Sequence, residues 1–427
     1  MQMTRRQALT LVAATVATPA LSAPRRISLR PEAVETTVVG RRLPMLAFNG
    51  QVPGPEIRLR QGNAAHIRLD NGLDDGALVH WHGLRVPNRM DGVNVLTQDV
   101  VIPGESFDYR FDVPVAGTYW YHSHYLSYEQ VSRGLFGAFI VEERDPPEVD
   151  HDITVQLFDM LLDADGQPDD SFDPSQFATA GRLGNVKLAI LSRDRVRLGD
   201  RLRLRFINPS IDRIYRLELS GLDGRIVALD GMPLEAPQAL GPIVLAPGQR
   251  CDVIADVTGD VTLRDTYYGA DDLLGRIALD GERPRSRADI PRLPANRVAQ
   301  PGRPAAVAML DLQGGAGAPA HPGTGTWALN DTSGLPAEPL LSVRRGTTVR
   351  IEIVNQTNFP HVMHLHGHHF YEITQKGQFG PKRDSTLLAE GETRSIIAVL
   401  DNPGRWMLHC HMLSHQADGM ATWLAVS

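Results

Sequence analysis

The sequence predicts an all-β protein made of sandwich-like domains, and two features of the chain support this. Segments such as 56–60 and 65–69 alternate polar and apolar residues, the period-two pattern of a half-buried strand, and segments 201–206 and 348–353 show it again. The 39 glycines and 30 prolines supply turns between many short strands. No long segment has helical periodicity. We therefore expect β-sandwiches.

A loose internal repeat suggests three copies of one unit. In each third of the chain a glycine precedes a strand that runs into an asparagine, and a Pro-Gly or related turn follows later. Three Greek-key units would explain the recurrence, although habits common to all β-sandwiches could produce part of it. The paired positions are Gly62 and Asn71, Gly199 and Asn208, and Gly346 and Asn355, with turns at Pro103-Gly104, Pro247-Gly248 and Glu390-Gly391.

Composition indicates where these units meet. The chain around 143–152 is charged and proline-rich, which is typical of a linker, and Pro, Gly, Ala and Arg dominate between about 281 and 325. A chain of 427 residues is also long enough for about three domains. We predict an export signal at 1–23, β domains at 24–146, 147–285 and 326–427, and a linker at 286–325.

The N-terminus has the pattern of an export signal. Arg5 and Arg6 precede an uncharged Ala/Leu/Val-rich run from 8 to 20, and small residues up to Ala23 suggest cleavage nearby. The run is too short and too weakly apolar to span a bilayer. The paired arginines favour the twin-arginine route, which exports folded proteins, over a general secretory signal that happens to carry two arginines. We expect a periplasmic or secreted protein.

Charge and cysteine content narrow the class further. The formal net charge is −7, and loss of the signal with its two arginines makes it more negative, which argues against binding to nucleic acid or to an anionic membrane. The two cysteines are Cys251 and Cys410, fewer than a disulfide-stabilised exported protein would carry. Cys251 lies in the strand-like run RCDVIADV and is expected to be a buried core thiol.

The arrangement of histidines carries the chemistry. Eight of the 15 histidines form four His-x-His pairs, and residues i and i+2 of a strand point to the same face. A single zinc site takes four ligands, so eight imidazoles suit a cluster of several metal ions. The pairs are His80/His82, His122/His124, His364/His366 and His409/His411.

The fourth pair contains a cysteine. Cys410 lies between His409 and His411 and should face the opposite side of the strand, so one segment can serve two metal sites. His415 and Met420 follow downstream. Two imidazoles, a thiolate and a long axial Met are the ligands of a blue copper site, and His361 is the natural second histidine.

Four motifs resemble the signatures of the multicopper oxidases, in order and at similar separations. They are HWHG at 80–83, HSH at 122–124, HVMHLHGH at 361–368 and HCHMLSHQADGM at 409–420, and the flanking NGQVPGPEIRL agrees. The resemblance covers nearly all of the mature chain. It implies three Greek-key cupredoxin-like β-sandwich domains, with a trinuclear copper cluster between the first and third and a mononuclear copper in the third.

Position by position, the resemblance implies four copper ions per chain, one of type 1, one of type 2 and two of type 3. The middle domain supplies no ligand and would act as a spacer and wall. Type 1 copper falls to His361, Cys410, His415 and Met420; type 2 copper to His80 and His364; type 3 copper to His82, His122, His124, His366, His409 and His411.

The implied activity is laccase-like: one-electron oxidation of a reducing substrate coupled to four-electron reduction of O2 to water. The donor would be phenolic or a similar organic molecule, because the eleven methionines are scattered rather than clustered as in copper-tolerance members. A cuprous oxidase is the alternative. A non-catalytic envelope protein on the same fold would have lost ligands, and a copper nitrite reductase needs fewer His-x-His pairs. We expect a monomer without membrane insertion.

Some positions near the motifs remain open. Asp91 matches a position where relatives keep an acid near the cluster, so it is either a proton relay or a turn residue before Gly92. Where some relatives carry a second carboxylate this chain has Gln416, and Asp418 is a weak substitute. Met420 suggests a moderate type 1 potential. Four further residues are expected to orient or pack rather than to bind metal or substrate: His368, His369, Trp81 and Trp406. Asp384, in the run PKRDSTLL, resembles a family position near the core of the third domain and is not expected to bind substrate.

Overall fold

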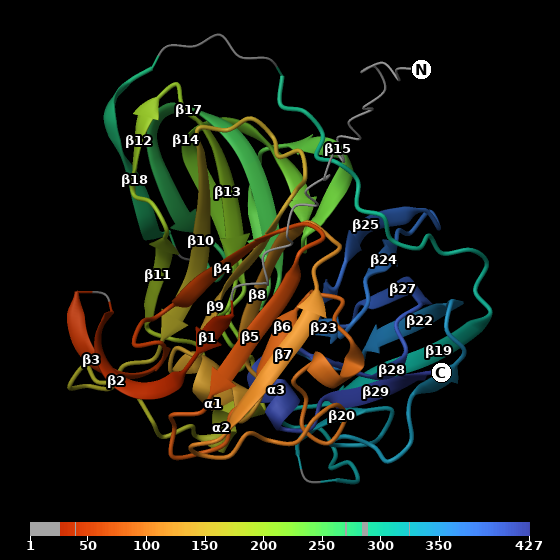
Figure 1. Ribbon diagram of the computed structural model, residues 1–427. Helices are drawn as coiled ribbons and strands as arrows, with labels where there is room; N and C mark the ends of the chain where they lie inside the picture. Colours follow the sequence, from red (N-terminus) through yellow and green to blue (C-terminus); the bar gives the residue numbers. More distant parts are fainter. Residues whose placement is uncertain (1–25, 39, 270, 284–288, 324) are drawn as a thin grey trace, which may run out of the picture.

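The computed structural model describes residues 26–427 except 39, 270, 284–288 and 324, and its strands fall into three consecutive groups (Figure 1). The predicted export signal at 1–23 lies outside the described residues. The helices are short, which confirms the all-β prediction. None of the helices in the described ranges has the length and apolar character that a membrane span needs.

The first group, red to orange in Figure 1, forms two sheets with the strand orders β1-β5-β7 and β4-β9-β8-β6, and a separate hairpin β2-β3. The predicted strands at 56–60 and 65–69 are β4 and β5. The elements are β1 (Ile27–Leu29), β2 (Pro31–Val38), β3 (Arg41–Phe48), β4 (Gly54–Arg60), β5 (Ala64–Asp70), β6 (Val79–His82), the 3-10 helix η1 (Asn88–Met90), β7 (Ser106–Asp112), β8 (Gly117–Ser123), α1 (Ser127–Ser132) and β9 (Phe136–Glu142).

The second group forms one nine-stranded sheet built on the order β11-β10-β13-β17-β14-β15, with β16 paired to β14, β18 to β17 and β12 to β18. The predicted strand at 201–206 lies in β13. The elements are β10 (His151–Met160), α2 (Pro174–Phe177), β11 (Val186–Leu191), β12 (Arg195–Leu198), β13 (Arg201–Ile207), β14 (Tyr215–Leu229), β15 (Met232–Ala239), β16 (Ile243–Leu245), β17 (Arg250–Asp265) and β18 (Asp272–Glu282).

The third group, teal to blue in Figure 1, forms two sheets with the orders β20-β19-β22-β27-β24-β25 and β21-β29-β28-β23-β26. The elements are β19 (Ala306–Gly314), β20 (Trp327–Leu329), β21 (Leu341–Val343), β22 (Thr347–Asn355), β23 (His361–Leu365), β24 (Phe370–Ile373), β25 (Phe379–Arg383), β26 (Ser385–Leu388), β27 (Thr393–Leu400), β28 (Gly404–Cys410), α3 (Leu413–Ala417) and β29 (Ala421–Val426).

The predicted linker at 286–325 is too long. Strand β19 lies inside it and pairs in parallel with β22 along most of its length, from Ala306 opposite Val349 to Leu312 opposite Asn355. Only one side of β19 buries apolar residues, at Ala308, Leu310 and Leu312. Because this short alternating segment lies between Pro- and Gly-rich flanks, it was assigned to the linker. The other predicted domain boundaries stay predictions.

The repeat is visible in the strand pairing of the three groups. In each, an early strand pairs in parallel with the strand that runs from the repeat glycine to the repeat asparagine: β1 with β5, β10 with β13, and β19 with β22. That strand then pairs antiparallel with β7, β17 or β27. The recurrence in sequence therefore corresponds to a recurrence in topology.

The three repeat asparagines make equivalent hydrogen bonds. Each side-chain amide donates to two main-chain carbonyls, one close in sequence and one at the start of a later strand or turn, and each side-chain oxygen accepts from the amide two residues on. The carbonyls are those of Asp75 and Val101 for Asn71, Arg213 and Leu245 for Asn208, and Phe359 and Ala389 for Asn355. These buried bonds close the same turn in all three groups.

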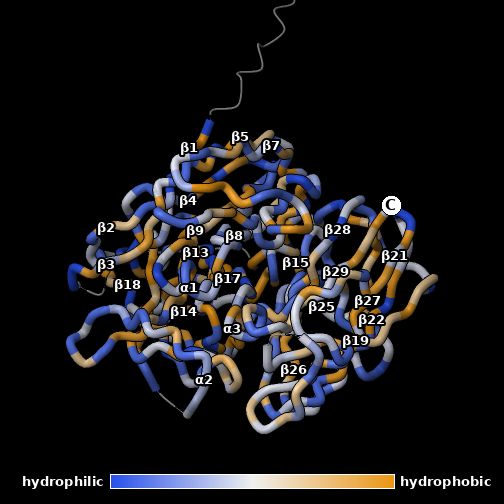
Figure 2. The backbone as a smooth tube through the Cα atoms, turned by 90° about the horizontal axis from the view of Figure 1, so that it is seen from below, coloured by the Kyte–Doolittle hydropathy of each residue, from blue (hydrophilic) through white to orange (hydrophobic). Residues whose placement is uncertain are grey.

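Each group has its own apolar core, and both cysteines are free and buried. Figure 2 shows apolar stretches on strands such as β22 and β27 and polar stretches in many connecting loops. A further cluster joins the first and second groups, where Trp120 packs with Phe158 and Ile207, and Leu413 of the third group reaches it. Cys251 lies in the core of the second group, as predicted.

We predict that Asn208→Ala lowers the free energy of unfolding by about 3 kcal/mol, because it leaves buried carbonyls and the Ser210 amide without partners. Chemical unfolding followed by circular dichroism measures the loss. Asn185→Ala is the control: its side chain also bonds a main-chain amide and carbonyl, both of Leu162, but it is exposed and water can replace it. Equal losses in the two variants would contradict the explanation.

Candidate metal centre

The four His-x-His pairs lie on two pairs of neighbouring strands. In the first group β6 pairs with β8, which sets His80 opposite His122. In the third group β23 pairs with β28, which sets His364 opposite His409. Since side chains alternate along a strand, the second member of each pair points to the same face as the first. Two faces lined with imidazoles therefore meet between the first and third groups.

The eight imidazoles converge into three sets of three, two of which share His82. Within each set the candidate ligand atoms lie within 4.8 Å of one another, and every residue is buried. Each set joins histidines from both ends of the chain, as the sequence predicts. The members are His80, His82 and His364; His82, His122 and His411; and His124, His366 and His409.

Hydrogen bonds of the outer ring nitrogens orient several of these imidazoles. In each case Nδ1 lies 2.8–2.9 Å from a main-chain carbonyl oxygen, that of Asp91 for His80, Ser123 for His122, Asp384 for His364 and Cys410 for His409. Bonding of one nitrogen to a carbonyl fixes the proton there and leaves the other nitrogen with a free lone pair. The free Nε2 atoms are thereby available as ligands.

Most of the nitrogens that face the interior have no protein partner; the exceptions are Nε2 of His366 and Nε2 of His409, which lie 3.0 Å from each other. Buried polar atoms normally make hydrogen bonds, so a concentration of orphaned nitrogens needs a cause. Metal ions coordinated by these lone pairs supply one, and the residues present fit a metal cluster. The orphaned atoms are Nε2 of His80, His122, His124 and His364, Nδ1 of His82, and both ring nitrogens of His411.

Burial also puts these side chains in the form that binds metal. The pKa values of His82, His122 and His411 lie well below the ordinary value, because burial disfavours the charged ring and neighbouring imidazoles add repulsion. Burial lowers the pKa of His124 to about 3. Neutral imidazole is the ligand form.

A second candidate site lies on the other face of β28. Cys410 Sγ is 3.7 Å from Nδ1 of both His361 and His415, and those two nitrogens are 3.0 Å apart. The main-chain amide of Cys410 donates to the carbonyl of Met420, whose side chain is fully buried. Burial raises the pKa of the Cys410 thiol to about 12. A thiol in such surroundings becomes a thiolate when a metal ion displaces its proton.

Asp91 lies against the histidine cluster. Its Oδ2 is 2.9 Å from Nδ1 of His366, its Oδ1 is 3.3 Å from Nδ1 of His80, and the residue is fully buried. It also ends η1, where its amide donates to the carbonyl of Asn88. Asp91 therefore lies near the cluster, as a proton relay must, and it also occupies a turn before Gly92. Its carboxylate contacts histidines from the two ends of the chain.

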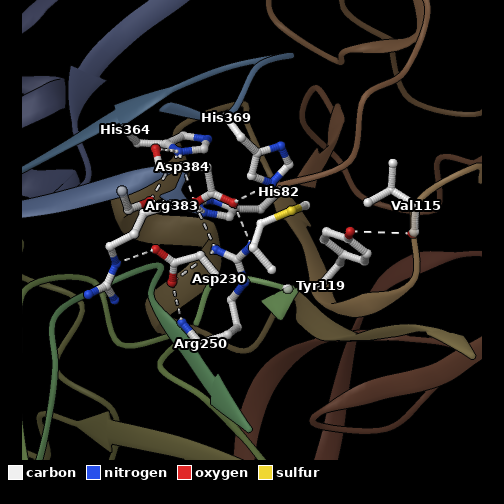
Figure 3. A network of polar contacts seen from close by, with 12 residues as sticks. His82, Val115, Tyr119, Asp230, Arg250, His364, His369, Arg383 and Asp384 are labelled. Carbon is white, nitrogen blue, oxygen red and sulfur yellow. Dashed lines mark hydrogen bonds and ion pairs between the residues drawn. The ribbon is translucent and has the colours of Figure 1, made fainter. Parts of the chain in front are cut away.

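Asp384 has a larger part in the site than the sequence suggested. Its carboxylate, fully buried, lies 3.2 Å from Nε2 of His82, and its carbonyl accepts from His364 (Figure 3). The Arg250 guanidinium binds both carboxylate oxygens, at 2.9 and 2.5 Å, and holds the pKa of the carboxyl well below its usual range. Sequence patterns placed Asp384 near the third core but offered no sign of its partners.

Arg250 comes from the middle group and touches all three. Besides Asp384 it bonds the carbonyl of Thr118 on β8, while Asp230 accepts from its main-chain amide and also binds Arg383 (Figure 3). None of the sets of potential metal ligands among the described residues includes a residue of the middle group. The middle group is nevertheless more than a spacer, because it holds the carboxylate that contacts two candidate ligands, His82 and His364.

The turn before Arg250 also approaches the cluster closely. Gly248 has φ +80°, and a Cβ atom there would lie 2.9 Å from Cε1 of His82 and 3.0 Å from the His411 ring. The Pro-Gly turn that the repeat predicts at 247–248 is therefore also a packing requirement of the metal site. Only glycine combines this backbone conformation with this proximity.

The remaining sequence candidates lie outside the metal-binding groups. Gln416 accepts a hydrogen bond from Ser127, and Asp418 binds the Thr326 amide, so neither carries a carboxylate into the cluster. His368 bonds the carbonyl of His366 and the amide of Asn402. His369 lies 3.7 Å from Asp384. Trp81 and Trp406 are fully buried packing residues, as predicted.

Comparison with known proteins agrees with this geometry. Residues 32–146 and 304–427 match multicopper oxidase domains. The crystal structure of Lac15 from a marine microbial metagenome is 44% identical, covers 95% of this chain and 100% of that one, and has a TM-score of 0.82. A multi-copper oxidase from Pseudomonas thermotolerans is 30% identical over 94% of this chain and 99% of that one, with a TM-score of 0.85.

Among the curated relatives, the multicopper oxidase MmcO of Mycobacterium tuberculosis is 29% identical over 93% of this chain and 86% of its own length. The chain belongs to the multicopper oxidase family. It is a copper-dependent oxidoreductase with cupredoxin-like β-sandwich domains.

We predict that Arg250→Met lowers the free energy of unfolding of the copper-free protein by about 3–5 kcal/mol, because the buried Asp384 carboxylate loses its counter-charge. Adding Asp384→Asn to that variant removes the stranded charge and should recover part of the loss. Urea unfolding of the two single variants and the double variant measures the coupling. Strictly additive losses would show that the ion pair does not act as a unit.

Proposed function

We propose that the two candidate sites hold four copper ions in the arrangement that the family resemblance implies. His361, Cys410, His415 and Met420 would hold the type 1 ion, and His80 and His364 the type 2 ion. The orphaned inward-facing nitrogens support this assignment most directly. The type 3 pair would be held by six residues: His82, His122, His124, His366, His409 and His411.

The bound copper would supply one-electron redox chemistry, accepting electrons singly and delivering four to O2. The protein contributes the geometry. Burial excludes water and lowers the pKa of imidazoles such as those of His82 and His122, and the carbonyl bonds keep the ligand nitrogens pointing inward. Cys410 is directly bonded to His409 and His411, so the main chain joins the two sites by a short covalent path.

For the reducing substrate we propose a phenolic or similar organic donor, in keeping with the absence of a methionine cluster from the sequence. Cuprous ion is the second candidate. One observation favours it: His415 is fully buried, and its Nε2 is 2.8 Å from the Thr179 carbonyl, which leaves no open face for a large donor. Copper resistance protein A of Pseudomonas syringae is also a relative, at 24% identity.

We also propose that the protein is exported by the twin-arginine route and acts in the periplasm or outside the cell as a monomer. The Arg5-Arg6 pair and the following apolar run support export. Fractionation of cells that express the Arg5→Lys, Arg6→Lys variant tests the route; unchanged export would exclude it. Analytical ultracentrifugation tests the oligomeric state.

Replacement of the two cysteines tests the copper assignment. Cys410→Ser should abolish the blue absorption band, remove about one copper ion per chain and stop donor-driven oxygen uptake, because serine cannot replace the soft thiolate. Cys251→Ser is the matched control, since it alters the chain's other buried cysteine and should keep all three properties. Uptake should be compared with 2,6-dimethoxyphenol and with Cu(I); none with either would overturn the oxidase proposal for this chain.

Asp91 is proposed as a proton relay to the cluster. Asp91→Asn preserves shape and a hydrogen-bond acceptor for His366 but cannot carry a proton, so kcat should fall about 10²-fold while the blue band, the copper content and KM for the donor stay unchanged. Steady-state kinetics with copper analysis measure this. If copper is lost together with activity, Asp91 orients ligands and the relay is excluded.

A further inference from the structure

One segment of the middle group lies over the candidate type 1 site. Between β10 and β11 the chain leaves its sheet and forms α2, which lies beside α3, the helix that carries His415 (Figure 1). Nδ1 of His415 faces Cys410 and His361. Nε2, on the opposite edge of the ring, faces the carbonyl of Thr179 at 2.8 Å. The ring edge that points away from Cys410 is therefore capped by the protein itself.

Three consecutive carbonyls at the end of α2 accept hydrogen bonds from the third group. The donors are Trp327 Nε1 to Phe177, the Ala316 amide to Ala178, and His415 Nε2 to Thr179, at 2.6, 2.7 and 2.8 Å. The Trp327 ring also packs on the His415 ring, with centroids 4.3 Å apart. This segment is thus docked on the site, and its backbone and Trp327 enclose His415.

The segment has a buried inner side and an exposed outer side. Phe177 is buried and packs edge-on against Tyr128 of the first group, at 5.0 Å between centroids. Asp173, Pro174 and Ser175 are exposed. His415 and Trp327 have no exposed surface, so this layer of chain separates the histidine from solvent.

We propose that the segment Asp173–Thr179 determines donor specificity by keeping bulky organic donors from touching His415. The proposal rests on the assignment of His415 to the type 1 copper. Small donors, which need no large contact surface, are oxidised across the thin segment. The connection between β10 and β11 that includes the segment bears the exposed carboxylates of Asp163, Asp165, Asp170 and Asp173, of which Asp170 lies 3.8 Å from Arg133. This excess of negative charge favours cationic donors over anionic ones.

The electron balance is the same for both classes of donor. A phenol gives up one electron and releases one proton to solvent, becoming a phenoxyl radical, and a cuprous ion becomes cupric. Four such electrons and four protons reduce one O2 to two molecules of water. The segment changes how closely a donor approaches His415 and leaves this stoichiometry unaltered.

Two variants open the site to different extents. In the first, residues 171–180 are replaced by three glycines; the side chain of Arg182 binds the Asp169 carbonyl and so ties the two flanks of the deletion together. In the second, Phe177→Ala removes only the side chain that seats the segment against Tyr128. Phe379→Ala is the control, because it removes an exposed phenylalanine on β25, away from α2 and α3.

The first measurement needs no copper. Diethyl pyrocarbonate is added to the copper-free proteins, and modification of His415 is followed by peptide mass spectrometry. His415 should be protected in the wild type and in Phe379→Ala, reactive in the deletion variant and intermediate in Phe177→Ala. Equal modification in all four proteins would overturn the proposal, because the segment would then not shield the ring.

The second measurement compares donors in the copper-loaded proteins. With the blue band unchanged, kcat/KM for 2,6-dimethoxyphenol should rise about tenfold or more in the deletion variant and less in Phe177→Ala, while that for Cu(I) stays unchanged. Equal gains for both donors, or none for the phenol, would overturn the proposal. If the deletion variant loses its blue band, the kcat/KM values of Phe177→Ala for the two donors decide whether the proposal stands. Absence of oxygen uptake with every donor would instead defeat the proposed function, and the labelling result would still stand.

Discussion

The ion pair between Arg250 and Asp384 is the constraint on which the geometry of the site depends. It lies where the three groups of strands meet: Arg250 from β17, the Thr118 carbonyl from β8, and Asp384 between β25 and β26. An unpaired carboxylate buried at this point would be strongly unfavourable, so the three groups must assemble together for either charge to be accommodated. Because Asp384 contacts both His82 and His364, docking of the groups and orientation of the ligands are one event.

The middle group takes part in the site through backbone and charge rather than through ligands. The Gly248 turn packs on His82 and His411, Arg250 fixes Asp384, and the Thr179 carbonyl caps His415. Each contact restricts the orientation of an imidazole. The contacting residue of the middle group does not itself occupy a coordination position. A cluster assembled from both ends of a chain needs such a template, since strands that supply ligands from two separate sheets cannot fix their own relative position.

Local patterns in the sequence predicted much of this structure. Period-two alternation found β4, β5, β13 and β22, and the i, i+2 rule placed His409 and His411 on one face of β28 and Cys410 on the other. Contacts between distant segments were not predictable in this way. Arg250 and Asp384 are 134 residues apart, and no spacing links them. Strand β19 was assigned to the linker for a related reason. Its pairing with the distant strand β22 makes it a strand, whereas its own flanks resemble a linker.

The alternation in β28 explains why burial matters as much as ligand identity. A strand that carries ligands on both faces must be covered on both, and here one face meets the histidines of the first group while the other meets His361 and α3. Enclosure lowers the pKa of imidazoles such as those of His82, His122 and His411 and denies water to the cluster, but it also removes direct access for a reductant. A buried site that exchanges electrons with a donor therefore needs a region where only a short stretch of protein separates it from solvent. The α2 segment fits this description, because its carbonyls contact Trp327 and His415 on one side and solvent meets its other side.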